Sequence, residues 1–117
     1  MKTLKDLDRT DRKILAVLQK DGRIANVDLA RTVNLTPTPC LERVRRLENE
    51  GFITGYVALL DPVRANAALC AYIEVQLTST TTESIKRFNE AMLALEEVQE
   101  CQMVAGGFDY LIKIRVA

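Results

Sequence analysis

The sequence contains no histidine, and its only cysteines are three isolated residues, Cys40, Cys70 and Cys101. Without histidine the chain lacks the usual general base and the commonest metal ligand. An odd number of widely spaced cysteines indicates reduced thiols in a cytoplasm and argues against a disulfide scaffold or a zinc site. No paired carboxylates and no phosphate loop are present either. We therefore expect a cytoplasmic protein that needs no cofactor or metal and is not an enzyme.

Long apolar runs are absent as well. None approaches the roughly 20 residues that a membrane span needs, and no secretory signal pattern opens the chain, so no membrane partner is expected. The chain also has no excess of positive or negative charge, because 16 Lys and Arg balance 16 Asp and Glu. Residues 1–62 hold 11 basic and 9 acidic residues, whereas residues 63–117 hold 5 and 7. The first half is thus mildly basic, and its affinity for nucleic acid would depend on pairing of chains.

What the chain does contain is a helix-turn-helix pattern. A short helix is expected to begin with Asn26 as its N-cap, and Asn34 suits the left-handed residue that would end it. The run Thr36-Pro37-Thr38-Pro39 offers two starts for the next helix. Either threonine could be the N-cap, since each precedes a proline that suits the first helical position. This second helix is expected to stop at Gly51.

The second helix is expected to bury one side and expose the other. Its apolar positions are Cys40, Leu41, Val44 and Leu47. Thr38 and Pro39 lie at the exposed start, and three arginines follow, a residue type that reads guanine and clamps phosphate. On charge alone these arginines would form an ordinary solvated face, with Glu42 pairing to Arg46. The helix-turn-helix context favours DNA.

Flanking segments complete a small head. Asp8 is a suitable N-cap for a preceding helix whose apolar stripe is Ile14, Leu15, Val17 and Leu18. That helix would pack across the other two. Residues 52–59 have the pattern of a strand, a glycine turn and a second strand, which predicts a two-stranded wing.

The second half has a different pattern. We expect a head over residues 1–60, a hinge linker over residues 61–66 and a second domain over residues 67–117. In that domain alternating apolar residues predict a strand from Leu69 to Leu77. A helix with Thr80 and Glu83 as its capping box, a second strand, a glycine turn and a third strand follow. The order is β-α-β-β, in which the last two strands form a hairpin.

Several of these segments together resemble the Lrp/AsnC family of amino-acid-responsive transcription regulators. They are Leu7-Asp8-Arg9-Thr10-Asp11, Leu18-Gln19-Lys20-Asp21-Gly22-Arg23, residues 36–48 and Gly51-Phe52-Ile53. The resemblance implies an α+β fold, with an N-terminal winged helix-turn-helix followed by a ferredoxin-like effector domain. That domain is incomplete here, because the sequence given stops at Ala117, where the family has a second helix and a fourth strand. The candidate DNA contacts on the matched helix are Thr36, Thr38, Pro39, Cys40, Arg43, Arg45 and Arg46.

The resemblance also indicates a candidate effector site. Its residues are Gly106, Gly107, Phe108, Asp109 and Tyr110, which match the family's glycine-turn segment beside the amino-acid pocket. A glycine-rich turn lets backbone N–H groups approach a ligand carboxylate, and Asp109 could pair with the ligand ammonium. The alternative is a plain hairpin turn in which glycine only supplies positive φ.

The function that these patterns favour is sequence-specific transcription regulation. The partners would be double-stranded DNA, a second copy of the chain in a homodimer or higher oligomer, and an amino-acid effector such as leucine or another small amino acid. The alternative is a small-molecule-binding or assembly module that does not itself regulate genes. A steep fall of DNA affinity with salt, combined with sequence preference, is expected only of the regulator.

Overall fold

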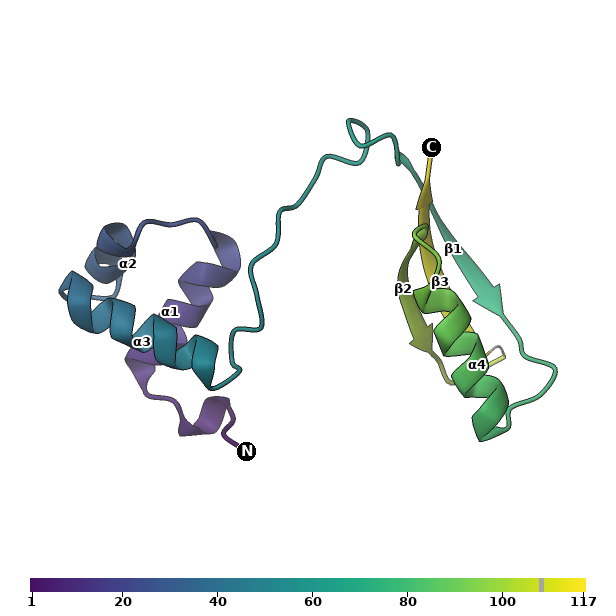
Figure 1. Ribbon diagram of the computed structural model, residues 1–117, viewed down its shortest axis with the longest axis horizontal. Helices are drawn as coiled ribbons and strands as arrows, with labels where there is room; N and C mark the ends of the chain where they lie inside the picture. The colour runs from purple at the N-terminus through teal and green to yellow at the C-terminus, as the bar shows by residue number, and fades with distance from the viewer. Residues whose placement is uncertain (108) are drawn as a thin grey trace. The chain divides into compact units, whose positions relative to one another are not determined.

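The structure, a computed structural model, describes residues 1–107 and 109–117, and it divides the chain into two compact units, Met1–Ala58 and Leu59–Ala117 (Figure 1). The predicted α+β class is confirmed. The elements in chain order are η1 Leu4–Asp6, α1 Arg9–Lys20, α2 Asn26–Thr32, α3 Pro37–Asn49, β1 Leu69–Val75, α4 Thr82–Leu93, β2 Val98–Met103 and β3 Tyr110–Val116. In the described ranges no helix has both the length and the apolar character that a membrane crossing requires.

The first unit is a three-helix head built as the apolar stripes predict. Its buried residues are Leu7, Ile14, Leu29, Ala30, Val33, Cys40 and Leu47. Asp8 caps α1 as expected, because its side chain accepts a hydrogen bond of 2.8 Å from the backbone N–H of Asp11. Leu41, which the pattern placed on the apolar face of α3, is 36% exposed and lies at the edge of that face.

The wing differs from the prediction. Residues 53–60 carry no regular secondary structure, so the two expected strands are not formed. The physical reason is that the second of them finds nothing to pack on, since Val57 and Leu59 are 86% and 94% exposed. An isolated two-stranded ribbon is at best marginally stable in water. The segment is instead held at its start, where the backbone N–H groups of Phe52 and Ile53 both donate to the carbonyl of Leu47.

The second unit begins with a compact turn and continues into a three-stranded antiparallel sheet in the order β1-β3-β2. The pairing of β1 with β3 and the β2–β3 hairpin follow the predicted β-α-β-β order. The alternation in β3 is confirmed, because Tyr110 and Ile112 share a face and are both buried.

Helix α4 lies against the sheet (Figure 1). Its Phe88 ring packs on the ring of Tyr110, with centroids 4.5 Å apart. The predicted capping box is displaced by one residue, since Thr81 is the N-cap and its hydroxyl accepts from the backbone N–H of Ser84. The helix therefore starts at Thr82 and not one residue earlier.

The apolar face of β1 is only partly covered. Leu69 and Ile73 are 56% and 43% exposed, although both belong to the apolar alternation of this strand. Among the strands that the structure describes, β1 pairs only with β3, so its other edge is open. An open edge with exposed apolar side chains is a surface on which a further strand or chain can be accommodated.

Candidate nucleic-acid interface and ligand cavity

The turn between α2 and α3 is set by backbone geometry. Asn34 adopts φ of 60°, the left-handed conformation that its position predicted. The backbone N–H of Leu35 then donates to the carbonyl of Ala30 at 2.8 Å, which closes the end of α2. Leu35 packs against the core as the apolar plug of the turn. The chain is thereby reversed within a few residues and enters α3 in a fixed direction.

Asn26 has a role different from the predicted one. It is the first residue of α2 and not its N-cap, which is Ala25 and makes no side-chain cap bond. The amide of Asn26 instead donates to the backbone carbonyl of Pro37 at 2.8 Å. This bond joins the start of α2 to the start of α3, so the side chain orients the two helices against each other.

Helix α3 starts at the earlier of its two possible sites. Thr36 is the N-cap and Pro37 is the first helical residue, although the Thr36 hydroxyl makes no cap bond. Thr38 and Pro39 are consequently in the first turn, and both are exposed. The helix ends before Gly51, whose φ of 83° is a conformation that side chains other than glycine rarely adopt.

The buried carboxylate of Asp11 connects α1 to α3. Its side chain is 3% exposed, and its two oxygens accept from the guanidinium groups of Arg43 and Arg46. Arg43 also binds both oxygens of Asp8, at 2.8 and 2.9 Å, while Arg46 lies 3.7 Å from Glu50. Solvent screens these pairs in part, because the arginines are about a third exposed, but removing either arginine leaves the buried carboxylate of Asp11 with less compensation. These contacts therefore fix α3 against α1.

The same network shifts the pKa of three of its members. The backbone N–H of Asp11 and then the guanidinium of Arg43 lower the pKa of Asp8 below its ordinary value. The hydrogen bond from Arg43 to Asp8, followed by that to Asp11, raises the pKa of Arg43. The bond to Asp11 likewise raises the pKa of Arg46. Both arginines are thus held in their charged forms against α1.

The predicted DNA contacts fall into separate groups on the helix. Cys40 is wholly buried in the core, and burial raises the pKa of its thiol, so its inclusion among the contacts is wrong. Arg43 and Arg46 lie on the flank of α3 that faces α1, with side chains 30% and 39% exposed. The pairing of Arg46 with Glu42, which belonged to the alternative of a solvated face, is not formed, since Arg46 pairs with Asp11 and Glu50.

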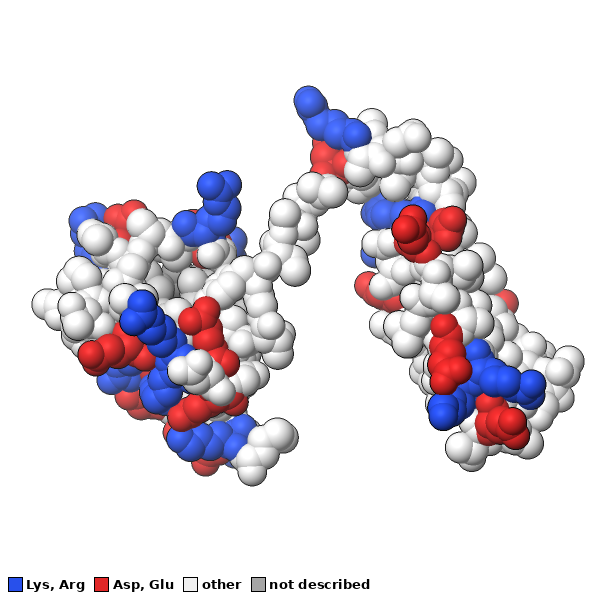
Figure 2. Space-filling view, in the orientation of Figure 1, with Lys and Arg blue, Asp and Glu red and all other residues white. Residues whose placement is uncertain are grey.

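Another group faces outward. Thr36, Thr38, Pro39 and Arg45 are all exposed. Figure 2 shows basic and acidic side chains intermingled on the visible face of the head. An attraction to phosphate therefore comes from individual arginines and helix geometry more than from a broad basic patch.

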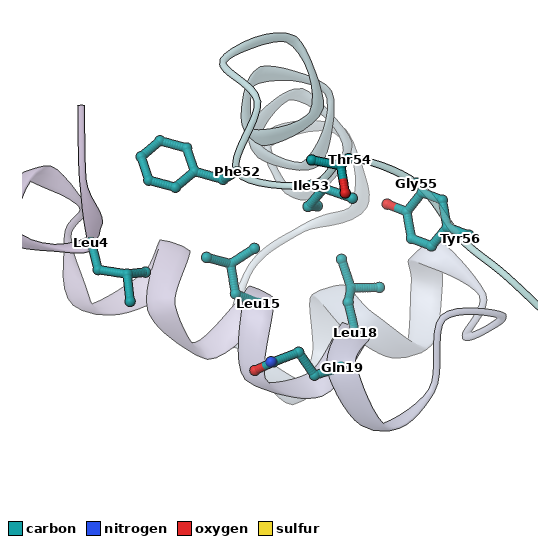
Figure 3. A pocket seen from close by; sticks show the side chains of 9 residues that line it. All are labelled: Leu4, Leu15, Leu18, Gln19, Phe52, Ile53, Thr54, Gly55 and Tyr56. Atoms are coloured by element: carbon teal, nitrogen blue, oxygen red, sulfur yellow. The ribbon is translucent and has the colours of Figure 1, made fainter. Parts of the chain in front are cut away.

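A groove lies between α1 and residues 52–56 of the head. Its volume is about 440 Å³, and apolar side chains of α1 and of residues 52–56 line it (Figure 3). At one end the Tyr56 ring lies over Gly22, where a Cβ would come within 3.2 Å of the tyrosine Cδ1. Gly22 therefore permits the extended segment to dock on the end of α1. Burial raises the pKa of Tyr56, and the carboxylate of Glu48 adds to that shift.

A smaller cavity lies beside the glycine turn of the second unit. It has a volume of about 200 Å³ and is lined by Leu77, Thr80, Ile85, Met103, Val104, Asp109 and Tyr110. That volume exceeds the space that one water molecule needs. Tyr110 is 2% exposed, and its hydroxyl is buried without a hydrogen-bond partner in the described part of the chain. A buried polar atom without a partner beside a cavity marks a place where a ligand or water can bond.

The other predicted effector residues have mixed roles. Gly106 has φ of 140°, so at least one glycine of the turn serves backbone geometry. Asp109 accepts a 2.7 Å bond from the backbone N–H of Leu77 through one carboxylate oxygen, and its own N–H donates to the carbonyl of Val75. It thus fixes the end of β1 at the rim of the cavity. Phe108 was also predicted, but it lies outside the described residues.

Sequence patterns missed the second role of Asp8 and Asp11. Asp8 was predicted only as the N-cap of the helix, and Asp11 was assigned no partner. The available signal was position, because Asp11 stands three residues before Ile14 and therefore shares its buried face. A carboxylate on such a face requires cationic partners, and α3 carries arginines.

These features define a class, a helix-turn-helix DNA-binding head joined to a small ligand-binding sheet domain. Residues 7–54 match the family described as winged helix-turn-helix DNA-binding, and residues 70–117 match the Lrp/AsnC ligand binding domain. Leucine-responsive regulatory proteins of Klebsiella pneumoniae and Escherichia coli K12 are each 57% identical to the chain over 112 residues, covering 96% of it and 68% of each relative.

Solved structures agree with these matches. An AsnC family transcriptional regulator from Agrobacterium tumefaciens has a TM-score of 0.89 at 41% identity, covering 94% of this chain and 72% of its own. A transcriptional regulator from Neisseria meningitidis in complex with L-Met has a TM-score of 0.87 at 39% identity, with coverage of 93% and 70%. The chain belongs to the Lrp/AsnC family of transcription regulators. As a member of a regulator family it is not an enzyme, as the sequence predicted.

The lowered pKa of Asp8 predicts an acid-sensitive head. An ionised Asp8 stabilises the fold at every pH above its unfolded-state pKa of about 4, and this contribution is lost as pH falls through the lower folded-state value. Asp8→Asn keeps a capping side chain but cannot ionise. Below about pH 4 the thermal midpoint of the wild-type head should therefore fall more steeply with pH than that of the variant. Circular dichroism melts at a series of pH values measure both slopes, and equal slopes would contradict the assignment.

Proposed function

We propose that this chain is a sequence-specific, amino-acid-responsive transcription regulator that binds double-stranded DNA as a homodimer or higher oligomer. The observation that carries the proposal is the fixed presentation of α3. Its first turn is exposed at Thr36, Thr38 and Pro39, while its other side is held by the core and by Asp11. A rigid helix with an open N-terminal half is the element that helix-turn-helix proteins insert into the major groove.

The proposed DNA-binding surface is Thr36, Thr38, Pro39 and Arg45, which are all exposed. Arg43 and Arg46 flank this surface, and Asp8 and Asp11 hold their guanidinium groups. Hydroxyls at the exposed helix start suit contacts to phosphate or base edges, and free backbone N–H groups there favour an anion. Because the head has almost balanced charge, one head alone would bind weakly. Two heads on half-sites about one helical turn apart would supply the missing affinity.

The second unit is the proposed sensor and assembly domain, with residues 61–66 as the hinge to the head. We place the effector site at Gly106, Gly107, Asp109 and Tyr110, around the cavity beside the turn. The cavity lining is mostly apolar and includes Asp109 and Tyr110, whose buried hydroxyl has no hydrogen-bond partner in the part of the chain that the structure describes. This chemistry fits a small apolar amino acid, whose ammonium would face the carboxylate. Leucine and methionine are natural first probes, because the matched relatives are named as leucine-responsive or bound to L-Met.

Binding of the effector would act through the equilibrium between assembled states. An amino acid that binds one arrangement of the sheet domains better than another shifts the population towards it. The spacing of the heads on DNA would change accordingly. Such a protein would work in the cytoplasm, where both the DNA and free amino acids are found.

The DNA-binding proposal is tested by selecting bound duplexes from a random pool with the purified chain. We expect a two-fold-symmetric site, preferred over scrambled DNA by at least about 10³-fold, and an affinity that falls steeply with salt. The selection is repeated with leucine and with methionine to detect a change of affinity or spacing. Recovery of no preferred sequence under any of these conditions would support a module for small-molecule binding or assembly in place of a regulator.

The effector site is tested by Tyr110→Phe. The hydroxyl has no partner among residues 1–107 and 109–117, so removing it should leave the thermal midpoint unchanged or slightly raised, because no hydrogen bond of the described structure is lost. If the hydroxyl bonds the ligand, affinity for leucine or methionine should fall by roughly tenfold, about the worth of one hydrogen bond. Isothermal titration calorimetry measures the affinity. Tyr72→Phe, at a tyrosine 62% exposed on β1, is the matched control. Equal affinities of wild type and Tyr110→Phe would remove the hydroxyl from the site.

A further inference from the structure

The outward side of α3 carries a separate set of polar groups. Thr38, Glu42 and Arg45 follow one another at spacings of four and three residues, so they form one stripe along the helix. All three are exposed. Within the described ranges none of their side chains takes part in an ion pair or hydrogen bond. The guanidinium of Arg45 is therefore free to meet a partner outside the chain.

The other two arginines are differently placed. Arg43 donates to Asp8 and Asp11, and Arg46 donates to Asp11, so their strongest contacts are already inside the head. To turn either guanidinium towards a base would leave the buried carboxylate of Asp11 with less compensation. Residue type alone makes the three arginines equivalent, but their surroundings do not.

We propose that Arg45 is the arginine that reads sequence, with the N7 and O6 atoms of a guanine as its target, while Arg43 and Arg46 are positioning residues. The inference rests on the proposed DNA-binding function and assigns its specificity. Arginine binds guanine bidentately in the major groove, and the acceptor Glu42 one turn earlier on the same stripe matches the amino group of cytosine. A G·C pair in each half-site is therefore the expected feature under the middle of α3.

The test combines variants of the full protein chain with DNA sites in which one base is changed. Guanines of the selected site are replaced one at a time by 7-deazaguanine, which lacks the N7 acceptor. Wild-type affinity, measured by fluorescence anisotropy, should fall about tenfold at one symmetric pair of guanines. Arg45→Ala should bind the natural site about tenfold more weakly and should no longer respond to this replacement. Its thermal midpoint should equal that of the wild type, because the exposed side chain makes no hydrogen bond or ion pair within the head.

Two control variants distinguish loss of base recognition from a general loss of positive charge and from destabilisation of the head. Arg31→Ala removes the same charge from an exposed arginine of α2 and should retain the full response to 7-deazaguanine. Arg46→Lys keeps a donor for Asp11 and should retain the response to 7-deazaguanine, with a lowered thermal midpoint.

Two results overturn the assignment. One is a full response to 7-deazaguanine in Arg45→Ala, and the other is loss of that response in Arg46→Lys with an unchanged melt. If the wild type itself prefers no site, the proposed function fails, and the assignment fails with it. The two failures are therefore distinguishable.

Discussion

The carboxylate of Asp11 is the constraint on which the head depends. It is a buried charge, and burial of a charge is tolerated only with close and well-directed partners. Those partners are two arginines of the proposed recognition helix. Apolar packing at Leu47 and Cys40 holds α3 against the core but does not by itself fix its rotation or its position along its axis. The two charged hydrogen bonds to the Asp11 carboxylate fix both the rotation and the axial position of α3, because each bond requires a defined distance and direction.

This constraint explains how a head with nearly balanced charge can have a specific DNA-binding surface. Three acidic groups, Asp8, Asp11 and Glu50, neutralise two of the arginines on the flank of α3. Although their charges are neutralised, Arg43 and Arg46 still determine which side of α3 faces outward. What remains on that side is a short polar stripe that includes Arg45. The sheet domain then supplies the proposed pairing of heads and the proposed response to an amino acid.

Much of the fold could be predicted from the sequence because its signals are local. Periodic apolar residues, the Asp8 cap, the left-handed Asn34 and the stop at Gly51 each depend on a few neighbouring residues. The failures involve partners distant along the chain. Asn26 bonds to Pro37 and not to its own helix, and the wing strands lack the packing partners that strand formation needs.

The same distinction applies to the candidate sites. The segment of α3 could be found from its threonines, prolines and arginines, but the separate roles of its arginines could not. Those roles follow from carboxylates more than 30 residues earlier in the chain. Cys40 was misplaced because a matched segment does not distinguish buried from exposed positions. In the second unit the turn was predictable from its glycines. The burial of the Tyr110 hydroxyl without a partner among the described residues was not, because it depends on how α4 packs on the sheet.

The central claim is that Asp11 and Arg46 act together to fix α3, and a double-mutant cycle measures this directly. The free energy of opening of the head is obtained from native-state hydrogen exchange of amides in α1 and α3 for wild type, Asp11→Ala, Arg46→Ala and the double variant. We expect the double variant to lose at least about 1 kcal/mol less than the sum of the single variants, as contacting charges in one network do. Additivity within about 0.3–0.5 kcal/mol would show that the two residues do not depend on each other and would contradict the account.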